Sequence, residues 1–203
     1  MSRVRTRPTR DDTREKLFEA AAQVFENEGI GGASIEAIAA AAGFTRGAFY
    51  SNFKSKDELI IAMLEDHVEH SIRRNLDLLA KHDNLAGFID ALRTADRSRQ
   101  DPLGRSPLLH MEMILFVARA EKRRPELAKR LRARRRLVAD IVRTTLEKSG
   151  RNGAVDPEWT GAIALALEDG FRLHRLIDPE TTPQDSFLRA ITDLQRAMGI
   201  SPA

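Results

Sequence analysis

Apolar residues recur along this chain at intervals of three and four positions, which is the spacing of one face of an α-helix. The first such stretch predicts a helix over residues 12–27, whose apolar stripe is Leu17, Ala20, Ala21, Val24 and Phe25. Glycines at positions 29, 31 and 32 then interrupt the pattern. We find no convincing strand pattern, so the sequence predicts an all-α protein.

Two short helical patterns follow, joined by a glycine. Ser34 is a candidate N-cap for the first, because its side-chain oxygen can accept a hydrogen bond from a free backbone N–H. Gly43 closes that helix, since glycine adopts the left-handed conformation that often ends a helix. Thr45 can cap the second helix, which is barely two turns long. Two helices joined by a tight glycine turn indicate a helix-turn-helix, whose second helix enters the DNA major groove.

Further helices are predicted after this motif. The sequence Ser55-Lys56-Asp57-Glu58 is a capping box that opens a long helix. Prolines at positions 107, 125 and 157 stand where the first turn of a helix tolerates proline. The predicted ranges are 55–81, 85–98, 107–120, 125–148, 157–177 and 184–198. Together with the three earlier helices, they give about nine helices.

The second helix of the motif carries the candidate DNA-binding side chains. Thr45 and Arg46 stand at its N-terminus, where helix-turn-helix proteins reach base edges. Gly47 costs a helix roughly 1 kcal/mol relative to alanine, which suggests that this position serves close contact with a partner. Polar and cationic residues lie around the helix, and the candidates for phosphate contacts are Ser34, Tyr50, Asn52, Lys54 and Lys56.

A longer signature surrounds these residues. It reads Thr45-Arg46-Gly47-Ala48-Phe49-Tyr50, then Asn52-Phe53, then Ser55-Lys56-Asp57-Glu58-Leu59. This stretch resembles the DNA-binding signature of TetR/AcrR-type transcriptional regulators, because it defines the turn, the second helix and the next N-cap together. The resemblance implies a three-helix helix-turn-helix domain with a basic N-terminal arm over residues 1–54. It further implies a helical effector-binding and dimerisation domain over residues 55–203.

The resemblance also implies a function. We expect a sequence-specific DNA-binding transcriptional regulator, and in particular a repressor that a small apolar ligand releases from its operator. The expected partners are double-stranded DNA with a palindromic operator, a second copy of the chain in a homodimer, and a small-molecule effector. Two alternatives stay open: a DNA-binding dimer without an effector, and a ligand-binding dimer that has lost DNA specificity.

Two groups of apolar residues are candidates for the sites of the second domain. The run from Leu108 to Val117 is the most apolar in the chain, and it forms either a ligand pocket or an ordinary core. In TetR-like proteins the pocket typically involves this region, which here implies the ligand-binding residues Met63, His67, His110, Met113 and Phe116. The last two long helices of such proteins pair with a second subunit, which implies the dimer-interface residues Leu165, Leu167, Phe171 and Leu194.

Composition narrows the class of protein. The 203 residues include no cysteine, which excludes disulfides and thiolate metal sites. No secretory signal is present at the N-terminus, and no apolar stretch approaches the ~20 residues of a membrane span, so we expect a cytoplasmic protein without a membrane partner. The net charge is only +3, but the start of the chain carries Arg3, Arg5, Arg7 and Arg10 without an acid. This segment is either an arm that follows DNA or a solvated tail.

Signatures of catalysis are missing from the sequence. We find no nucleophile elbow, phosphate loop or dinucleotide fingerprint. His67 and His70 could share one helix face, but nothing in the spacing supplies a third metal ligand. We therefore expect no enzyme, no catalytic residue, no metal and no cofactor. We interpret the basic stretch over residues 119–136 as a solvated helical face rather than a second nucleic-acid surface.

Overall fold

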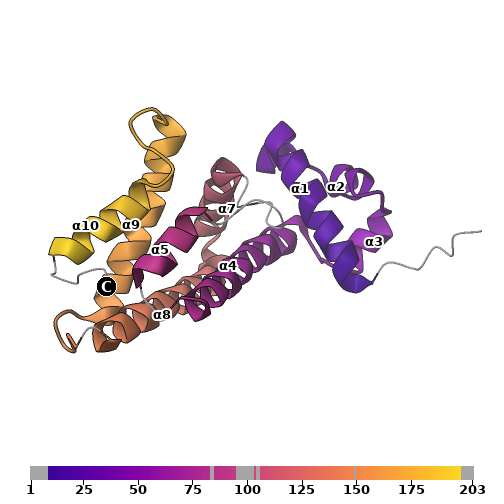
Figure 1. Ribbon diagram of the computed structural model, residues 1–203. Helices are drawn as coiled ribbons and strands as arrows, with labels where there is room; N and C mark the ends of the chain where they lie inside the picture. Colours follow the sequence, from indigo (N-terminus) through magenta and orange to yellow (C-terminus); the bar gives the residue numbers. More distant parts are fainter. Residues whose placement is uncertain (1–8, 83–84, 95–102, 104–105, 149, 198–203) are drawn as a thin grey trace, which may run out of the picture. The chain divides into compact units, whose positions relative to one another are not determined.

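The computed structural model describes residues 9–82, 85–94, 103, 106–148 and 150–197 (Figure 1). These residues form nine α-helices and one short 3₁₀ helix, and no strand occurs among them. The predicted all-α class is therefore confirmed. Three predictions fall on residues outside the described ranges: the arm arginines Arg3, Arg5 and Arg7, residues 95–98 of one helix, and Met198 at the end of another.

The helices follow the predicted ranges closely. Their bounds are α1 Arg10–Gly32, α2 Ile35–Ala41, α3 Arg46–Tyr50, α4 Lys56–Ala80, α5 Leu85–Thr94, α7 Pro107–Arg119, η1 Glu121–Arg123, α8 Arg124–Lys148, α9 Pro157–Ile177 and α10 Ser186–Ala197. The chain divides into two compact units, which we describe separately. The first unit comprises residues 1–67 and 100–124, and the second comprises residues 68–99 and 125–203. The predicted domain boundary after residue 54 stays a prediction.

Helix α1 begins at a capping box. The Thr9 side chain accepts from the Asp12 backbone N–H at 3.1 Å, and the Asp12 carboxylate accepts from the Thr9 N–H at 2.9 Å. The helix runs past the predicted end at residue 27, but Gly29 has a φ of 72° and interrupts the helical backbone there. Gly29 therefore does break the helix, as its sequence position suggested, and one more turn follows it.

An aromatic core holds the first unit together. Phe18, Phe25, Phe49 and Phe53 are buried, whereas Phe44 is half-buried. The rings of Phe18 and Phe53 have centroids 5.7 Å apart, and Phe49 lies 5.8 Å from Phe53. Helix α7 contacts α1 and adds the buried side chains of Leu109, Met113 and Val117 to the same unit. The α1 stripe predicted from the sequence is buried as expected.

Residues at the start of α4 cap that helix and form hydrogen bonds with the end of α1. The Ser55 hydroxyl accepts from the Glu58 N–H at 3.1 Å, as a capping box requires. The Glu58 carboxylate, however, accepts from the Lys54 N–H at 2.8 Å, one residue before the predicted position. The Lys56 ammonium donates to the carbonyls of Ile30, Gly31 and Ala33, at 2.7, 3.4 and 2.8 Å. Lys56 thus satisfies carbonyls that the end of α1 leaves without helical partners.

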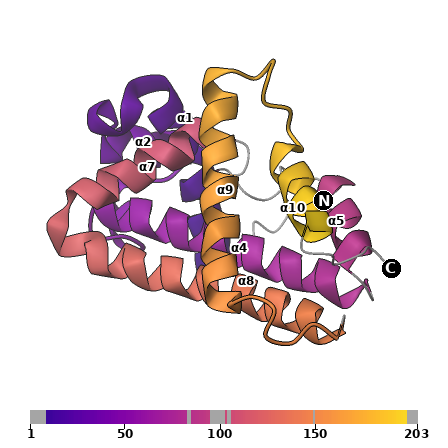
Figure 2. The same cartoon turned by 90° about the vertical axis from the view of Figure 1, so that its left-hand side faces the viewer.

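The second unit contains α5, α8, α9 and α10 with the C-terminal part of α4. Helix α9 approaches α8 closely at Gly161, where an added Cβ would lie 3.0 Å from the backbone nitrogen of Ala139. Both residues are buried. Figure 2 shows α5 beside α10, and an ion pair joins them, with the Arg93 Nε lying 3.9 Å from the Asp185 carboxylate. The second unit therefore combines close backbone packing of α9 on α8 with an ion pair between α5 and the start of α10.

Candidate nucleic-acid interface

The helix-turn-helix is formed by α2 and α3, which pack against each other. The Ser34 hydroxyl oxygen accepts from the Ala37 N–H at 3.0 Å, and Thr45 Oγ1 accepts from the Ala48 N–H at 3.2 Å. Gly43 lies between the helices with a φ of 73°, a conformation that only glycine adopts without strain. Both predicted caps and the predicted glycine turn are therefore present.

Helix α3 has one buried and one exposed face. Phe49 is fully buried and anchors the helix to the aromatic core. Thr45, Arg46 and Gly47 are all exposed at the N-terminal end of α3. Among the described residues, a Cβ added to Gly47 would meet only the Thr45 hydroxyl, at 3.7 Å, so no packing there demands glycine. The three predicted base-reading residues are thus presented together to solvent.

The Arg46 side chain is held by two neighbours. Its guanidinium lies 2.9 Å from the Glu36 carboxylate of α2 and donates to the Tyr50 hydroxyl at 3.4 Å. The guanidinium carbon also lies 5.4 Å from the centroid of the Tyr50 ring. The hydrogen bond to Tyr50 and the charge of Glu36 raise the pKa of Arg46. The guanidinium is therefore positioned at the start of α3 before any DNA arrives.

Glu36 was missed by the sequence analysis. It lies in the first turn of α2, ten residues before Arg46 in sequence. Helical spacing shows which residues share one face of a helix, but it does not show which residue of α2 faces the start of α3. The acidic side chain itself was the available signal, because it stands two residues after the candidate N-cap Ser34 in a motif that is predicted to bind a polyanion.

The candidate phosphate ligands fall into two groups. Tyr50 and Lys54 are exposed, so their polar ends are accessible from solvent. Ser34, Asn52 and Lys56 are engaged within the protein. Ser34 caps α2, the Asn52 amide donates to the Ala48 carbonyl at 2.9 Å, and the Lys56 ammonium donates to carbonyls near the end of α1. Phosphate contacts by these five residues stay predictions, and for Lys56 such a contact would compete with its present bonds.

The five predicted ligand-binding residues all belong to the first unit. Met63, His110 and Met113 are buried, whereas His67 and Phe116 are half-buried. The rings of His67 and His110 lie 4.4 Å apart, centroid to centroid. A cavity of about 180 Å³ in the second unit is lined by none of these five residues. Their role in ligand binding stays a prediction.

The four predicted dimer-interface residues differ in exposure. Leu165 is buried and lines the cavity of the second unit, and Leu194 lines the same cavity while remaining partly exposed. Leu167 and Phe171 are half-buried on α9. The sequence analysis missed other large apolar side chains on α9, which are exposed. Among them are Trp159, Leu173 and Ile177. They were missed because a helix of mostly apolar residues does not reveal which face its own unit covers.

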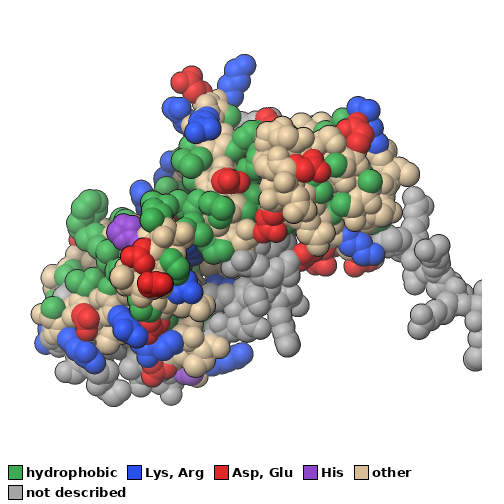
Figure 3. Space-filling model, turned by 90° about the horizontal axis from the view of Figure 1, so that it is seen from above, with side chains coloured by type: hydrophobic (Ala, Val, Ile, Leu, Met, Phe, Trp, Pro, Cys, Tyr) green, Lys and Arg blue, Asp and Glu red, His purple; other side chains and the backbone are tan. Residues whose placement is uncertain are grey.

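The charge on the surface is mixed. Figure 3 shows acidic and basic side chains interspersed on one face of the molecule, with hydrophobic side chains exposed among them.

No described helix is long and apolar enough to cross a membrane. Within the described ranges, no group of three or more histidine, cysteine, aspartate or glutamate side chains could hold a metal ion.

Curated relatives match part of this chain. It is 34% identical over 88 residues to the HTH-type transcriptional regulator TtgR of Pseudomonas putida, covering 43% of this chain and 40% of TtgR. It is 34% identical over 91 residues to the HTH-type transcriptional activator FasR of Mycolicibacterium smegmatis, covering 45% of this chain and 36% of FasR. The matched stretches thus span less than half the length of either relative.

Structural similarity extends over the whole chain. A TetR-family transcriptional regulator from Cytophaga hutchinsonii aligns with a TM-score of 0.72 at 17% identity, over 98% of this chain and 99% of that one. The family model for the bacterial regulatory proteins of the tetR family matches residues 17–63. The model for the tetracyclin repressor-like C-terminal domain matches residues 82–197, more than half of the chain. The chain therefore belongs to the TetR family of transcriptional regulators.

Proposed function

We propose that this chain is a repressor that binds a palindromic operator as a homodimer and leaves it when a small apolar ligand binds. The observation that carries the DNA-binding part is the exposed N-terminal end of α3. Thr45, Arg46 and Gly47 are exposed together there, while Phe49 anchors the helix from its opposite face. Base edges in the major groove are contacted from this end of a recognition helix.

Arg46 is the residue that we propose to read a base. A guanidinium offers two parallel donors, which match the O6 and N7 acceptors of guanine in the major groove. Tyr50 lies beside Arg46, and Lys54 follows α3 in the sequence. Both side chains are exposed, so they are suited to phosphate contacts that fix the register of α3 on the duplex. In this proposal Arg46 determines which base sequence is bound, whereas Tyr50 and Lys54 contribute affinity for any DNA sequence.

The exposed face of α9 supports assembly into a homodimer. Trp159 and Ile177 are 67% and 76% exposed, and Ile163 and Leu173 are exposed between them. With Ala166 and Gly170, these residues follow alternating steps of four and three, which is the spacing of a seam between two packed helices. The small residues at the centre of the seam permit close approach, and a Cβ added to Gly170 would meet nothing within 4 Å among the residues that the structure describes.

A two-fold pair of recognition helices fits a palindromic operator. Dimeric helix-turn-helix proteins bind half-sites about one helical turn apart, roughly 34–36 Å from centre to centre. Each half-site then contributes its own base contacts, so loss of the dimer weakens operator binding far more than loss of one contact.

The cavity of the second unit supports a ligand response. It is lined mostly by aliphatic and aromatic side chains from α5, α8, α9 and α10. A ligand releases DNA only if it binds the DNA-incompetent conformation more tightly than the competent one. Coupling between two such sites is reciprocal, and it typically changes each affinity by about 5- to 150-fold.

The experiment that tests this function begins with genomic DNA. Fragments that the full-length protein selects are sequenced, and the common palindrome is placed before a reporter gene. We expect reporter expression to fall when the protein is present and to recover when an effector is added. A rise in expression would make the protein an activator, which is what FasR is named. Absence of any selected sequence would favour a ligand-binding dimer without DNA specificity.

A further inference from the structure

The cavity in the second unit has a definite chemistry. We propose that it binds a neutral, compact, apolar molecule that carries one hydrogen-bond donor, which the amide oxygen of Asn75 accepts. This inference rests on the ligand response of the proposed function and specifies it by naming the site and the class of ligand. The site differs from the residues around His110 that the sequence suggested, because none of those lines this cavity.

The walls of the cavity select an apolar molecule. Phe88 from α5, Ile141 and Val142 from α8, and Phe187 and Ile191 from α10 all line it. Its volume is about 180 Å³. An engineered apolar cavity of about 150 Å³ in another protein binds benzene. A cavity of the present size therefore suits one aromatic ring or two fused rings.

Asn75 supplies the polar anchor. It lies on α4 and lines the cavity, and its amide oxygen Oδ1 is buried without a hydrogen-bond partner. A buried acceptor without a donor is unfavourable, and such atoms are rare in folded proteins. A ligand that donates one hydrogen bond would remove that deficit, whereas a purely apolar ligand would leave it. This atom therefore specifies a donor on the ligand.

The charges at the cavity wall argue for a neutral ligand. Among the described side chains that line the cavity, Glu168 alone is ionisable. Its carboxylate accepts from Arg134 at 2.7 Å and from Arg172 at 3.0 Å. Because both carboxylate oxygens already accept from arginines, a cationic ligand would have to displace one of them.

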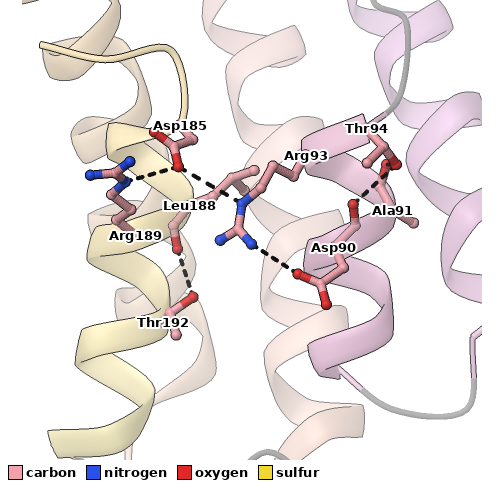
Figure 4. Close-up of polar contacts among 8 residues, drawn as sticks. All are labelled: Asp90, Ala91, Arg93, Thr94, Asp185, Leu188, Arg189 and Thr192. Carbon is pink, nitrogen blue, oxygen red and sulfur yellow. Dashed lines mark hydrogen bonds and ion pairs between the residues drawn. The ribbon is translucent and has the colours of Figure 1, made fainter.

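Helix α10 forms a wall that is fastened at its first turn. Figure 4 shows the Arg93 guanidinium lying between Asp90 of its own helix and Asp185 at the start of α10. The Arg93 nitrogens lie 2.9 Å from the Asp90 carboxylate and 3.9 Å from that of Asp185, which also accepts from Arg189 at 2.8 Å. These contacts link α5 with the start of α10, and both helices line the cavity.

Three probes of almost equal shape test the proposal. 2-Naphthol carries a donor, 2-methoxynaphthalene carries only an acceptor, and 2-methylnaphthalene carries neither. Binding of each to the full-length protein is measured by calorimetry, or by thermal shift where solubility is limiting. We expect 2-naphthol to bind about 3- to 10-fold more tightly than the other two, which is the effect of one hydrogen bond. Asn75→Leu should remove this preference and still bind 2-methylnaphthalene.

Two further variants locate the site. Ala164→Phe places a large ring at the cavity wall and should weaken binding of all three probes. Ile60→Val changes a buried residue of the first unit and should leave all three affinities unchanged. Retention of 2-methylnaphthalene binding by Asn75→Leu shows that this variant is folded. If Ala164→Phe leaves all three affinities unchanged, the proposed location is wrong.

Each remaining outcome has one meaning. Failure of all three probes to bind up to their solubility limits would overturn the site. Equal binding of the three probes, or preference for 2-methoxynaphthalene or 2-methylnaphthalene, would overturn the requirement for a donor. Unchanged preference in Asn75→Leu would remove Asn75 from the site. A separate operator titration distinguishes the underlying function: if 2-naphthol binds with the expected preference but does not weaken operator binding, the site stands and ligand-triggered release fails.

Discussion

The guanidinium of Arg46 lies 2.9 Å from the carboxylate of Glu36, and both side chains are more than half exposed. The proposed base-reading residue is therefore paired with an acid on the preceding helix when DNA is absent. A guanine must replace Glu36 as the partner of Arg46, or share the guanidinium with it. Because exposed ion pairs are weak, loss of the Glu36 contact costs little free energy. A base that offers two acceptors in the right geometry can replace that contact.

The first prediction concerns this pair. Arg46→Ala should weaken operator binding roughly 5- to 150-fold per half-site and relax the preference at one base pair. Glu36→Gln should instead strengthen binding to non-specific DNA by about 2- to 5-fold, because it removes both a competitor for Arg46 and a negative charge near the phosphates. The measurement is a titration of each variant with the operator and with a scrambled duplex. Unchanged ranking of operator base variants for Arg46→Ala would exclude the reading role.

The second prediction separates two neighbouring lysines. Lys54 is exposed, so Lys54→Ala should weaken specific and non-specific binding alike and lower the slope of log affinity against log salt by about one. Lys56 donates to carbonyls near the end of α1, so Lys56→Ala should lower the free energy of unfolding by about 1–3 kcal/mol. Salt titrations and denaturant melts of both variants provide the comparison. Equal melts would mean that the Lys56 bonds contribute no net stability.

The sequence predicted the parts of this protein that depend on neighbouring residues. Ser34, Gly43 and Thr45 were identified correctly because capping and turn formation involve residues only a few positions apart. The range of α9 was also correct, since Pro157 marks the first turn of a helix and a polar stretch precedes it.

Contacts between distant residues could not be predicted in the same way. The pairing of Glu36 with Arg46 and the bonds from Lys56 to α1 depend on how separate helices pack. The cavity around Asn75 is built from five helices, and no spacing along the chain brings those side chains together. Helical periodicity identifies the apolar face of each helix, but it does not show which faces meet or where they leave a space.

The third prediction concerns the closest approach of two helices. Gly161→Ala should destabilise the second unit by about 1–3 kcal/mol, because the new methyl group would lie 3.0 Å from the Ala139 nitrogen and a backbone must shift. Gly31→Ala in the last turn of α1, outside the proposed dimer seam, provides the control, because an added Cβ there meets nothing within 4 Å among the described residues. Its methyl group would enter open space, and alanine favours a helix over glycine by up to about 1 kcal/mol. Chemical denaturation at one protein concentration compares them, and equal stability of the two variants would contradict the close contact.

The fourth prediction concerns pH. The hydrogen bond from Arg189, with a smaller contribution from the charge of Arg93, lowers the pKa of Asp185 below its usual value of 3.8. A carboxylate with a lowered folded pKa stabilises the protein above the unfolded pKa, and this contribution disappears as the pH falls through the folded value. Asp185→Asn should therefore melt at a lower temperature than the parent at pH 7. The difference should narrow below pH 3.8, and a constant difference across that range would show that ionisation is not its cause.

The fifth prediction concerns the exposed seam of α9. A carboxylate at position 173 would lie within an apolar interface if the seam packs against a second copy, and burying an unpaired charge there is strongly unfavourable. Leu173→Glu should therefore give monomers in light scattering, retain its helical circular dichroism and lose cooperative operator binding. Glu180→Gln changes an exposed residue beyond the end of α9 and should remain dimeric. Charged replacements at Leu167 and Phe171 test the interface residues that the sequence suggested. A dimeric Leu173→Glu together with monomeric Leu167 and Phe171 variants would move the interface to the face that contains those two residues.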